Sequence, residues 1–156
     1  MKDATTLLQA AQSILAPWAK EFTYPDPMRL DVALAAGDIA PAAAALRAAG
    51  WGYLTAITGL DLGVEAGKLE VLYHFCDGPA LVNLRVTLPR DNPVINSVCG
   101  AIPSASFFER ELSEMFGVTV AGTPNPDKLF LPEDWPDGVY PLRKDFEPEL
   151  LTRGRP

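Results

Sequence analysis

Three runs of residues between positions 51 and 88 alternate in the manner of strands. Because successive side chains of a strand point to opposite faces of a sheet, such alternation predicts one buried face. The runs are 51–62, 68–76 and 81–88, and turn-forming residues at 63–67 and 77–78 separate them. The middle run predicts its core side chains most clearly: Leu69, Val71, Tyr73 and Phe75. We therefore expect a meander of three antiparallel strands.

Helical patterns come before and after this meander. Asp3 is placed to cap a helix that reaches about residue 18, and Asp38 to cap a second that reaches residue 49. Residues 28–34 alternate apolar and charged positions, which predicts a further strand. After a Pro-containing break, a short helix is expected over 94–98 and a longer one over 104–116. This order predicts an α+β fold, a mixed or antiparallel sheet of about four strands with helices packed on one face.

The last part of the chain is rich in Pro and in large apolar side chains but lacks periodicity. Its bulky residues are Leu131, Trp135, Leu142 and Phe146. Such a segment cannot easily build its own core, yet its side chains favour burial. We expect it to lie along a surface, either of its own domain or of a partner. The chain is thus divided into an α+β domain, 1–120, and an extended partner-binding tail, 121–156.

Composition restricts the class of partner. The net charge is −7, from 20 acidic and 13 basic residues, which argues against nucleic acid or anionic membrane and permits a basic protein partner. No apolar run reaches the roughly 20 residues of a membrane span, and the N-terminal residues do not suggest a signal peptide. Cys76, Cys99 and His74 are too few and too dispersed for a metal or iron–sulfur site. No nucleotide-binding motif is present either, so we expect this chain to bind no cofactor.

Four short motifs occur in a fixed order in the second half of the chain. They are Glu109-Arg110-Glu111, Met115-Phe116-Gly117, Leu131-Pro132-Glu133-Asp134-Trp135 and Pro141-Leu142-Arg143-Lys144-Asp145-Phe146. The ordered set resembles the thirty-kilodalton subunit family of respiratory complex I, the NADH:quinone oxidoreductase. That family includes counterparts in membrane-bound [NiFe] hydrogenases related to complex I. The resemblance covers most of the chain from about the second strand onward.

This resemblance implies a non-catalytic peripheral-arm subunit of a membrane-associated, ion-translocating oxidoreductase. The enzyme would be an NADH:quinone oxidoreductase or a related [NiFe] hydrogenase. Members dock on the catalytic large subunit, beside an iron–sulfur subunit, and the extended tail wraps the large subunit. The partners carry the iron–sulfur clusters and the quinone or nickel–iron site. The implied location is cytoplasmic, peripheral on the inner face of the cell membrane.

The chain departs from the family pattern in two places. Ser113-Glu114 stands where members commonly carry an aromatic residue followed by Asp. Thr123 and Asp127 replace a His and an Arg that commonly precede the Leu-Pro-Glu-Asp-Trp motif. The stretch from Trp135 to Pro141 is closer to the hydrogenase branch.

Aromatic and Arg side chains are concentrated at interfaces, so the same motifs supply the candidate interface residues. In the helix, Phe107 lies off the apolar stripe of Phe108, Leu112, Met115 and Phe116 and is free to meet another chain. A guanidinium binds carboxylates in a fork, so Arg110 is expected to anchor the tail or a partner carboxylate. Its spacing of four residues from Glu114 also predicts a surface ion pair between the two. Ser106 and Glu109 have capping-box spacing. The full candidate interface is Phe107, Glu109, Arg110, Glu111, Trp135, Pro141, Leu142, Arg143, Lys144, Asp145 and Phe146.

Two other functions remain open from the residues alone. One is a soluble adaptor or maturation factor for such a complex. The other is a stand-alone hydrolase that uses Glu109 or Glu111 with His74. Helical residues two positions apart point in different directions, which is poor geometry for a shared proton-transfer site.

Overall fold

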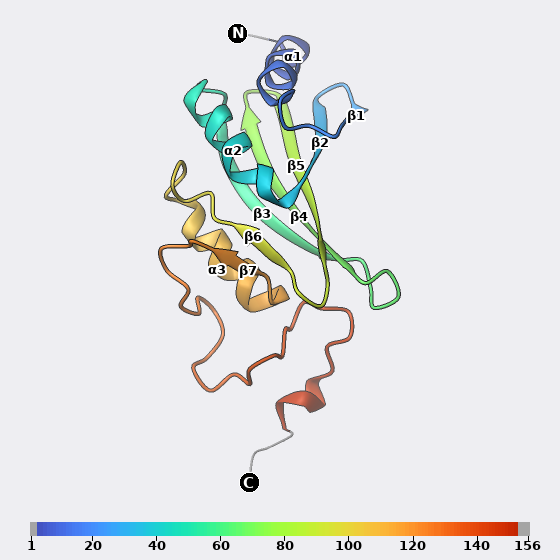
Figure 1. The fold of residues 1–156 in the computed structure, drawn as a ribbon, viewed down its shortest axis with the longest axis vertical. Helices are drawn as coiled ribbons and strands as arrows, with labels where there is room; N and C mark the ends of the chain where they lie inside the picture. The colour runs from blue at the N-terminus through green and yellow to red at the C-terminus, as the bar shows by residue number, and fades with distance from the viewer. Residues whose placement is uncertain (1–2, 153–156) are drawn as a thin grey trace.

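The fold is a mixed sheet with helices packed on one of its faces and the other face open. A long, mostly irregular tail follows the last strand (Figure 1). A computed structural model describes residues 3–152, so residues 1–2 and the last four residues of the predicted tail, 153–156, lie outside it. The elements are α1 (Ala4–Leu15), β1 (Glu21–Asp26), β2 (Arg29–Leu34), η1 (Ala36–Asp38), α2 (Ile39–Ala48), β3 (Tyr53–Asp61), β4 (Lys68–Asp77), β5 (Ala80–Pro89), β6 (Val94–Asn96), α3 (Ala105–Phe116), β7 (Thr119–Ala121) and η2 (Pro148–Leu151).

The main sheet has five strands in the order β1-β2-β5-β4-β3. Only β2 and β5 run parallel; the other neighbours are antiparallel. The predicted α+β class and the predicted meander β3-β4-β5 are confirmed. The strand missing from the prediction is β1, which is mostly exposed and contains Pro25. An exposed edge strand has no buried alternating face, so its sequence carries little strand signal.

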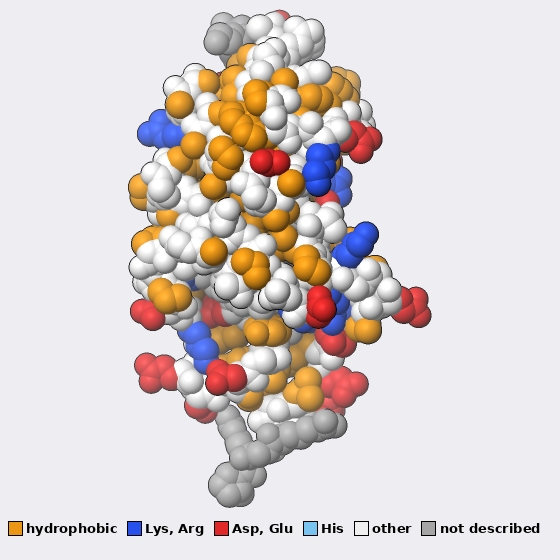
Figure 2. All heavy atoms as spheres, in the orientation of Figure 1, with side chains coloured by type: hydrophobic (Ala, Val, Ile, Leu, Met, Phe, Trp, Pro, Cys, Tyr) orange, Lys and Arg blue, Asp and Glu red, His pale blue; other side chains and the backbone are white. Residues whose placement is uncertain are grey.

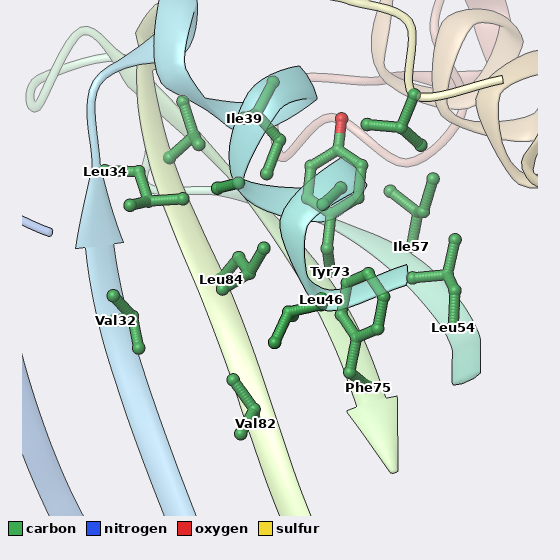
Figure 3. Close-up of a cluster of buried hydrophobic side chains, with 14 of the residues drawn as sticks. Val32, Leu34, Ile39, Leu46, Leu54, Ile57, Tyr73, Phe75, Val82 and Leu84 are labelled. Atoms are coloured by element: carbon green, nitrogen blue, oxygen red, sulfur yellow. The ribbon is translucent and has the colours of Figure 1, made fainter. Parts of the chain in front are cut away.

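One face of the sheet forms the core together with the helices. Register places Val32, Leu84, Tyr73 and Ile57 in one cross-strand row. Figure 3 shows Ile39 and Leu46 of α2 among these side chains. Each large apolar side chain buried in this way contributes about 1.5–3 kcal/mol. The alternation predicted for β4 therefore corresponds to side chains that are buried in the core.

The helix ends follow their capping chemistry only in part. Asp3 accepts a hydrogen bond from Thr6 N (2.8 Å) and caps α1 as predicted. Asp38 occupies the N-cap position of α2 without a side-chain capping bond. Gly117 ends α3 in the left-handed conformation with φ 71°, also as predicted.

The short helix predicted over 94–98 is wrong. Residues 94–96 form β6, which pairs in parallel with β7, and Ile95 between them is buried. The two strands lie on either side of α3 in the chain, so their pairing is non-local and overrides the local pattern. None of the helices in residues 3–152 is long and apolar enough to cross a membrane.

Candidate subunit-docking surface

Helix α3 turns one face to the core and leaves the other outside. Ala105, Glu109 and Leu112 are buried, and the partly buried Phe108 and Phe116 pack against the core. As predicted, Phe107 lies off this stripe, and it is 61% exposed.

Glu109 is a buried anchor. It is 1% exposed, and its carboxylate accepts hydrogen bonds from Val98 N (2.7 Å), Ser97 Oγ (2.8 Å) and Cys99 Sγ (3.1 Å). The capping-box prediction is wrong, because Glu109 holds the preceding loop and Ser104 occupies the N-cap position. Burial removes Glu109 from the candidate contact surface. Burial and the adjacent Glu109 carboxylate raise the pKa of Cys99 to about 11.

Arg110 and Glu114 fasten the tail to the outer side of α3. The Arg110 guanidinium donates to the backbone carbonyls of Asp127 (2.8 Å) and Lys128 (2.7 Å). The Glu114 carboxylate accepts from the backbone N–H groups of residues 129, 130 and 131 at 2.9, 2.8 and 3.2 Å. The predicted anchoring of the tail by Arg110 is confirmed, whereas the Arg110–Glu114 pair is wrong. The role of Glu114 was not predictable from the sequence, because nothing near it in the chain marks the three backbone amides that it binds at residues 129–131.

Figure 1 shows the tail as a long, looping segment after β7, and contacts within the tail itself hold its course between the attachments. The Lys128 ammonium donates to Trp135 O (3.2 Å), and the Trp135 indole N–H donates to Val139 O (2.7 Å). The Trp135 ring stacks with Phe146, with 6.3 Å between centroids. These two predicted interface residues are thus partly engaged within the tail itself.

The end of α3 provides a second attachment. Arg143 donates through Nε to Phe116 O (2.8 Å), and its guanidinium lies over the Tyr140 ring, 4.7 Å from the centroid. Burial lowers the pKa of Arg143. A Cβ on Gly117 would lie 2.4 Å from the Tyr140 ring, so only Gly combines this packing with a left-handed helix end.

A third attachment centres on Asp61 at the end of β3. Arg90 donates to both Asp61 carboxylate oxygens (3.1 and 3.0 Å) and to Asp145 (2.6 Å). The backbone N–H of Lys144 donates to Asp61 Oδ2 at 2.8 Å. The hydrogen bonds from Arg90, with those from the backbone, hold the pKa of Asp61 well below its usual range. The tail therefore lies along its own domain, and Lys144 and Asp145 take part in holding it there.

Several side chains on α3 and the tail point outward beyond these attachments. We call the exposed parts of α3 and residues 122–147 the α3–tail surface. Large apolar members of this surface are Phe107 (61% exposed), Phe130 (65%) and Leu142 (53%). Figure 2 shows acidic side chains gathered around the lower end of the molecule, where Figure 1 places the tail. Of the predicted interface residues, Leu142 and Glu111 meet at one small hollow that is described below.

The sheet face opposite the helices carries a polar network. His74 Nδ1 lies 2.7 Å from Asn83 Oδ1, and Asn83 Nδ2 donates to Asp31 (2.8 Å). Arg29 and Arg85 also donate to Asp31. Burial opposes ionisation of Asp31, but the bonds from Arg29 and Asn83 outweigh it and lower its pKa. His74 is therefore engaged on the face opposite α3 and is not brought together with Glu109 or Glu111.

Nothing in residues 3–152 groups three or more His, Cys, Asp or Glu side chains in a way that could hold a metal ion.

Sequence comparison connects most of the chain with respiratory enzymes. The family model described as the 30 kDa subunit of respiratory-chain NADH dehydrogenase matches residues 32–150. Over 97 residues the chain is 42% identical to the membrane-bound hydrogenase subunit beta of Pyrococcus furiosus, covering 60% of this chain and 56% of that protein. It is 37% identical over 97 residues to a subunit of the F(420)H(2) dehydrogenase of Methanosarcina mazei, covering 61% and 60%. The matches thus span less than two thirds of the length of either relative.

Solved structures share the fold. A chain of the membrane-bound sulfane sulfur reductase, an archaeal respiratory membrane complex, superimposes with a TM-score of 0.74 at 24% identity, covering 94% of this chain and 88% of that one. A trypsin-resistant fragment (1–134) of Nqo5 superimposes with a TM-score of 0.60, also at 24% identity, covering 77% and 96%. At this level of identity, the likeness describes the architecture alone.

Proposed function

Since the chain belongs to the family of the 30 kDa subunit of respiratory-chain NADH dehydrogenase, we propose that it is a non-catalytic peripheral-arm subunit of a membrane-associated, ion-translocating oxidoreductase. In this role it docks on the catalytic large subunit, beside an iron–sulfur subunit, and stabilises the assembly. The family match confirms the resemblance that the ordered motifs predicted.

The observation that carries the docking role is a tail fixed in place with apolar side chains directed outward. Arg110 binds the backbone carbonyl of Lys128, and Glu114 binds the backbone N–H groups of Phe130 and the residue after it. The Phe130 side chain itself is nevertheless 65% exposed. Exposed aromatic groups on an ordered segment lose little conformational freedom when a partner covers them. Contact with a protein partner is therefore more favourable for the α3–tail surface than exposure to water.

The relatives belong to a limited range of complexes, which suggests the type of complex that this chain joins. One relative is a subunit of a membrane-bound hydrogenase and the other a subunit of an F(420)H(2) dehydrogenase. We propose that the large subunit bound here is of the NADH:quinone oxidoreductase or [NiFe] hydrogenase type. In this arrangement the iron–sulfur clusters and the quinone or nickel–iron site lie in partner chains, and this chain sits peripherally on the cytoplasmic side of the membrane.

The docking role is tested by a substitution on the α3–tail surface that leaves the hydrogen bonds between the tail and its own domain intact. Phe130→Asp in the tagged full-length chain, expressed in the native host, is expected to lower recovery with the large subunit by about tenfold. Val64→Asp is the matched control, because Val64 is 62% exposed in the hairpin turn between β3 and β4. Both purified variants are expected to melt like the wild-type chain.

Deletion of residues 131–156 tests the whole tail in the same host. We expect it to abolish assembly, because it removes Leu142 and two attachments to the domain. An intact complex that contains the deleted chain would contradict the docking role. Recovery with an immature large subunit only, and absence from the finished complex, would instead indicate a maturation factor.

A further inference from the structure

The two edges of the main sheet are protected very differently. At one edge, β1 carries Pro25, an exposed Glu21 and an irregularity in register between Thr23 and Asp26. Such features prevent pairing with a foreign strand. At the other edge, the nine residues of β3 read YLTAITGLD, with no Pro, no Lys and no charge before the final Asp61. Unprotected edges of this length are templates for strand addition.

The register identifies which backbone groups of β3 are unpaired. Leu62 N donates to Lys68 O, so residues 60 and 58 also belong to hydrogen-bonded pairs with β4. The alternate residues, Ile57 and Gly59, then direct their N–H and C=O groups away from β4. Within residues 3–152, no hydrogen bond from outside the sheet reaches these outward groups.

A hollow lies beside this unpaired stretch. Its volume is about 150 Å³, and it is lined by Ile57, Thr58, Gly59, Glu111, Leu112, Phe116 and Leu142. An apolar cavity of about this size accommodates a benzene-sized group. Gly59 lets the Phe116 ring pack directly on β3 at the side of the hollow, since a Cβ there would lie 2.5 Å from that ring. One apolar side chain of an added strand thus fits between β3 and α3.

The rim of the hollow carries an unpaired charge. Glu111 is half-buried, and no hydrogen bond or ion pair reaches its carboxylate from any described residue. A partly buried carboxylate without a partner is unfavourable, and an incoming cation relieves that cost. The net charge of −7 favours a basic partner in the same way.

We infer that β3 is the attachment site for an extended segment of the large subunit. This segment adds to the sheet as a sixth strand through the backbone groups of Ile57 and Gly59. It places one apolar side chain in the hollow beside Leu142 and a Lys or Arg against Glu111. The inference rests on the proposed function and specifies the partner chemistry at one part of the docking region.

Amide hydrogen exchange on the purified native complex and on the isolated chain tests the strand directly. The amides of Ile57 and Gly59 are expected to exchange rapidly in the isolated chain and at least about a hundredfold more slowly in the complex. The amides of Thr58 and Leu60, which face β4, serve as an internal control and are expected to be protected in both. Rapid exchange of Ile57 and Gly59 within an intact complex would overturn the inference and leave the proposed function standing.

Charge reversal provides an independent check. Glu111→Lys is expected to lower recovery of the complex by about tenfold, whereas Glu65→Lys, the same change in the exposed hairpin turn, is expected to leave it unchanged. Equal recovery of the two variants would contradict the role of Glu111.

If Ile57 and Gly59 become protected in a concentration-dependent dimer of the isolated chain, the occupant is a second copy and the inference is wrong. If the wild-type chain joins no complex at all, the proposed function itself fails.

Discussion

Three carboxylates join the irregular parts of the chain to its regular elements. Glu109 binds the amide of Val98 in the preceding loop, Glu114 binds the tail at residues 129–131, and Asp61 binds the tail at Lys144. Each accepts from backbone N–H groups, and such charge-assisted bonds are roughly twice as strong as neutral ones. The capping-box spacing predicted the wrong partner for Glu109, because burial of a carboxylate depends on neighbours that local spacing does not mark.

Asp61→Asn tests the attachment at the end of β3. Asp61 is 3% exposed and binds Arg90 through both oxygens, so loss of the charge leaves that guanidinium poorly paired. We expect the free energy of unfolding to fall by about 3 kcal/mol in urea titrations. Asp137→Asn in the exposed part of the tail is the control and is expected to change it by less than about 0.5 kcal/mol.

The same carboxylate gives a pH dependence with a defined sign. The pKa of Asp61 is lower in the folded chain than in the unfolded chain, chiefly because of Arg90. Its stabilisation is therefore fully present above about pH 4 and is lost as the pH falls toward the folded-state pKa. Unfolding curves collected from pH 6 downward should show a smaller acid-induced loss in Asp61→Asn than in the wild-type chain. Identical acid profiles would exclude Asp61 as a source of acid sensitivity.

Among the elements, those with local signals were predictable. The alternation over 68–76 predicted β4, and Gly117 predicted the end of α3. Strands β6 and β7 were not predictable, because each has only three residues and its partner lies on the far side of α3. Within the candidate site, Arg110 was predicted as an anchor of the tail. The backbone carbonyls that Arg110 binds were not predictable, because every residue has a carbonyl and the sequence does not indicate which of them accepts a bond.

Glu114→Ala tests whether α3 orders the tail. The substitution removes the acceptor of three backbone N–H groups, so the tail is expected to open locally while the sheet stays folded. Hydrogen exchange at residues 129–131 should accelerate by at least about tenfold, with β4 unaffected. Glu111→Ala is the control, since Glu111 lies on the same helix and no described residue bonds to its carboxylate. Unchanged exchange at 129–131 would show that other contacts hold the tail.

At the scale of the whole molecule, the fold separates three surfaces. Helices cover one sheet face, and the tail extends from α3 past the end of β3 (Figure 1). A polar network of side chains lies on the other sheet face. The tail is held by its own domain, so its exposed side chains are already in position before any partner arrives. Such preorganisation lowers the entropic cost of association. The docking role proposed for the α3–tail surface follows from this arrangement and from the family.

The most direct measurement is a pull-down of the tagged wild-type chain from solubilised membranes of the native host, with the co-purifying chains identified by mass. The account predicts stoichiometric recovery with a catalytic large subunit, either of the quinone-oxidoreductase type or of the nickel-binding type, together with an iron–sulfur subunit. Recovery of the chain alone from a soluble fraction would contradict the docking role, although the fold and the family would stand.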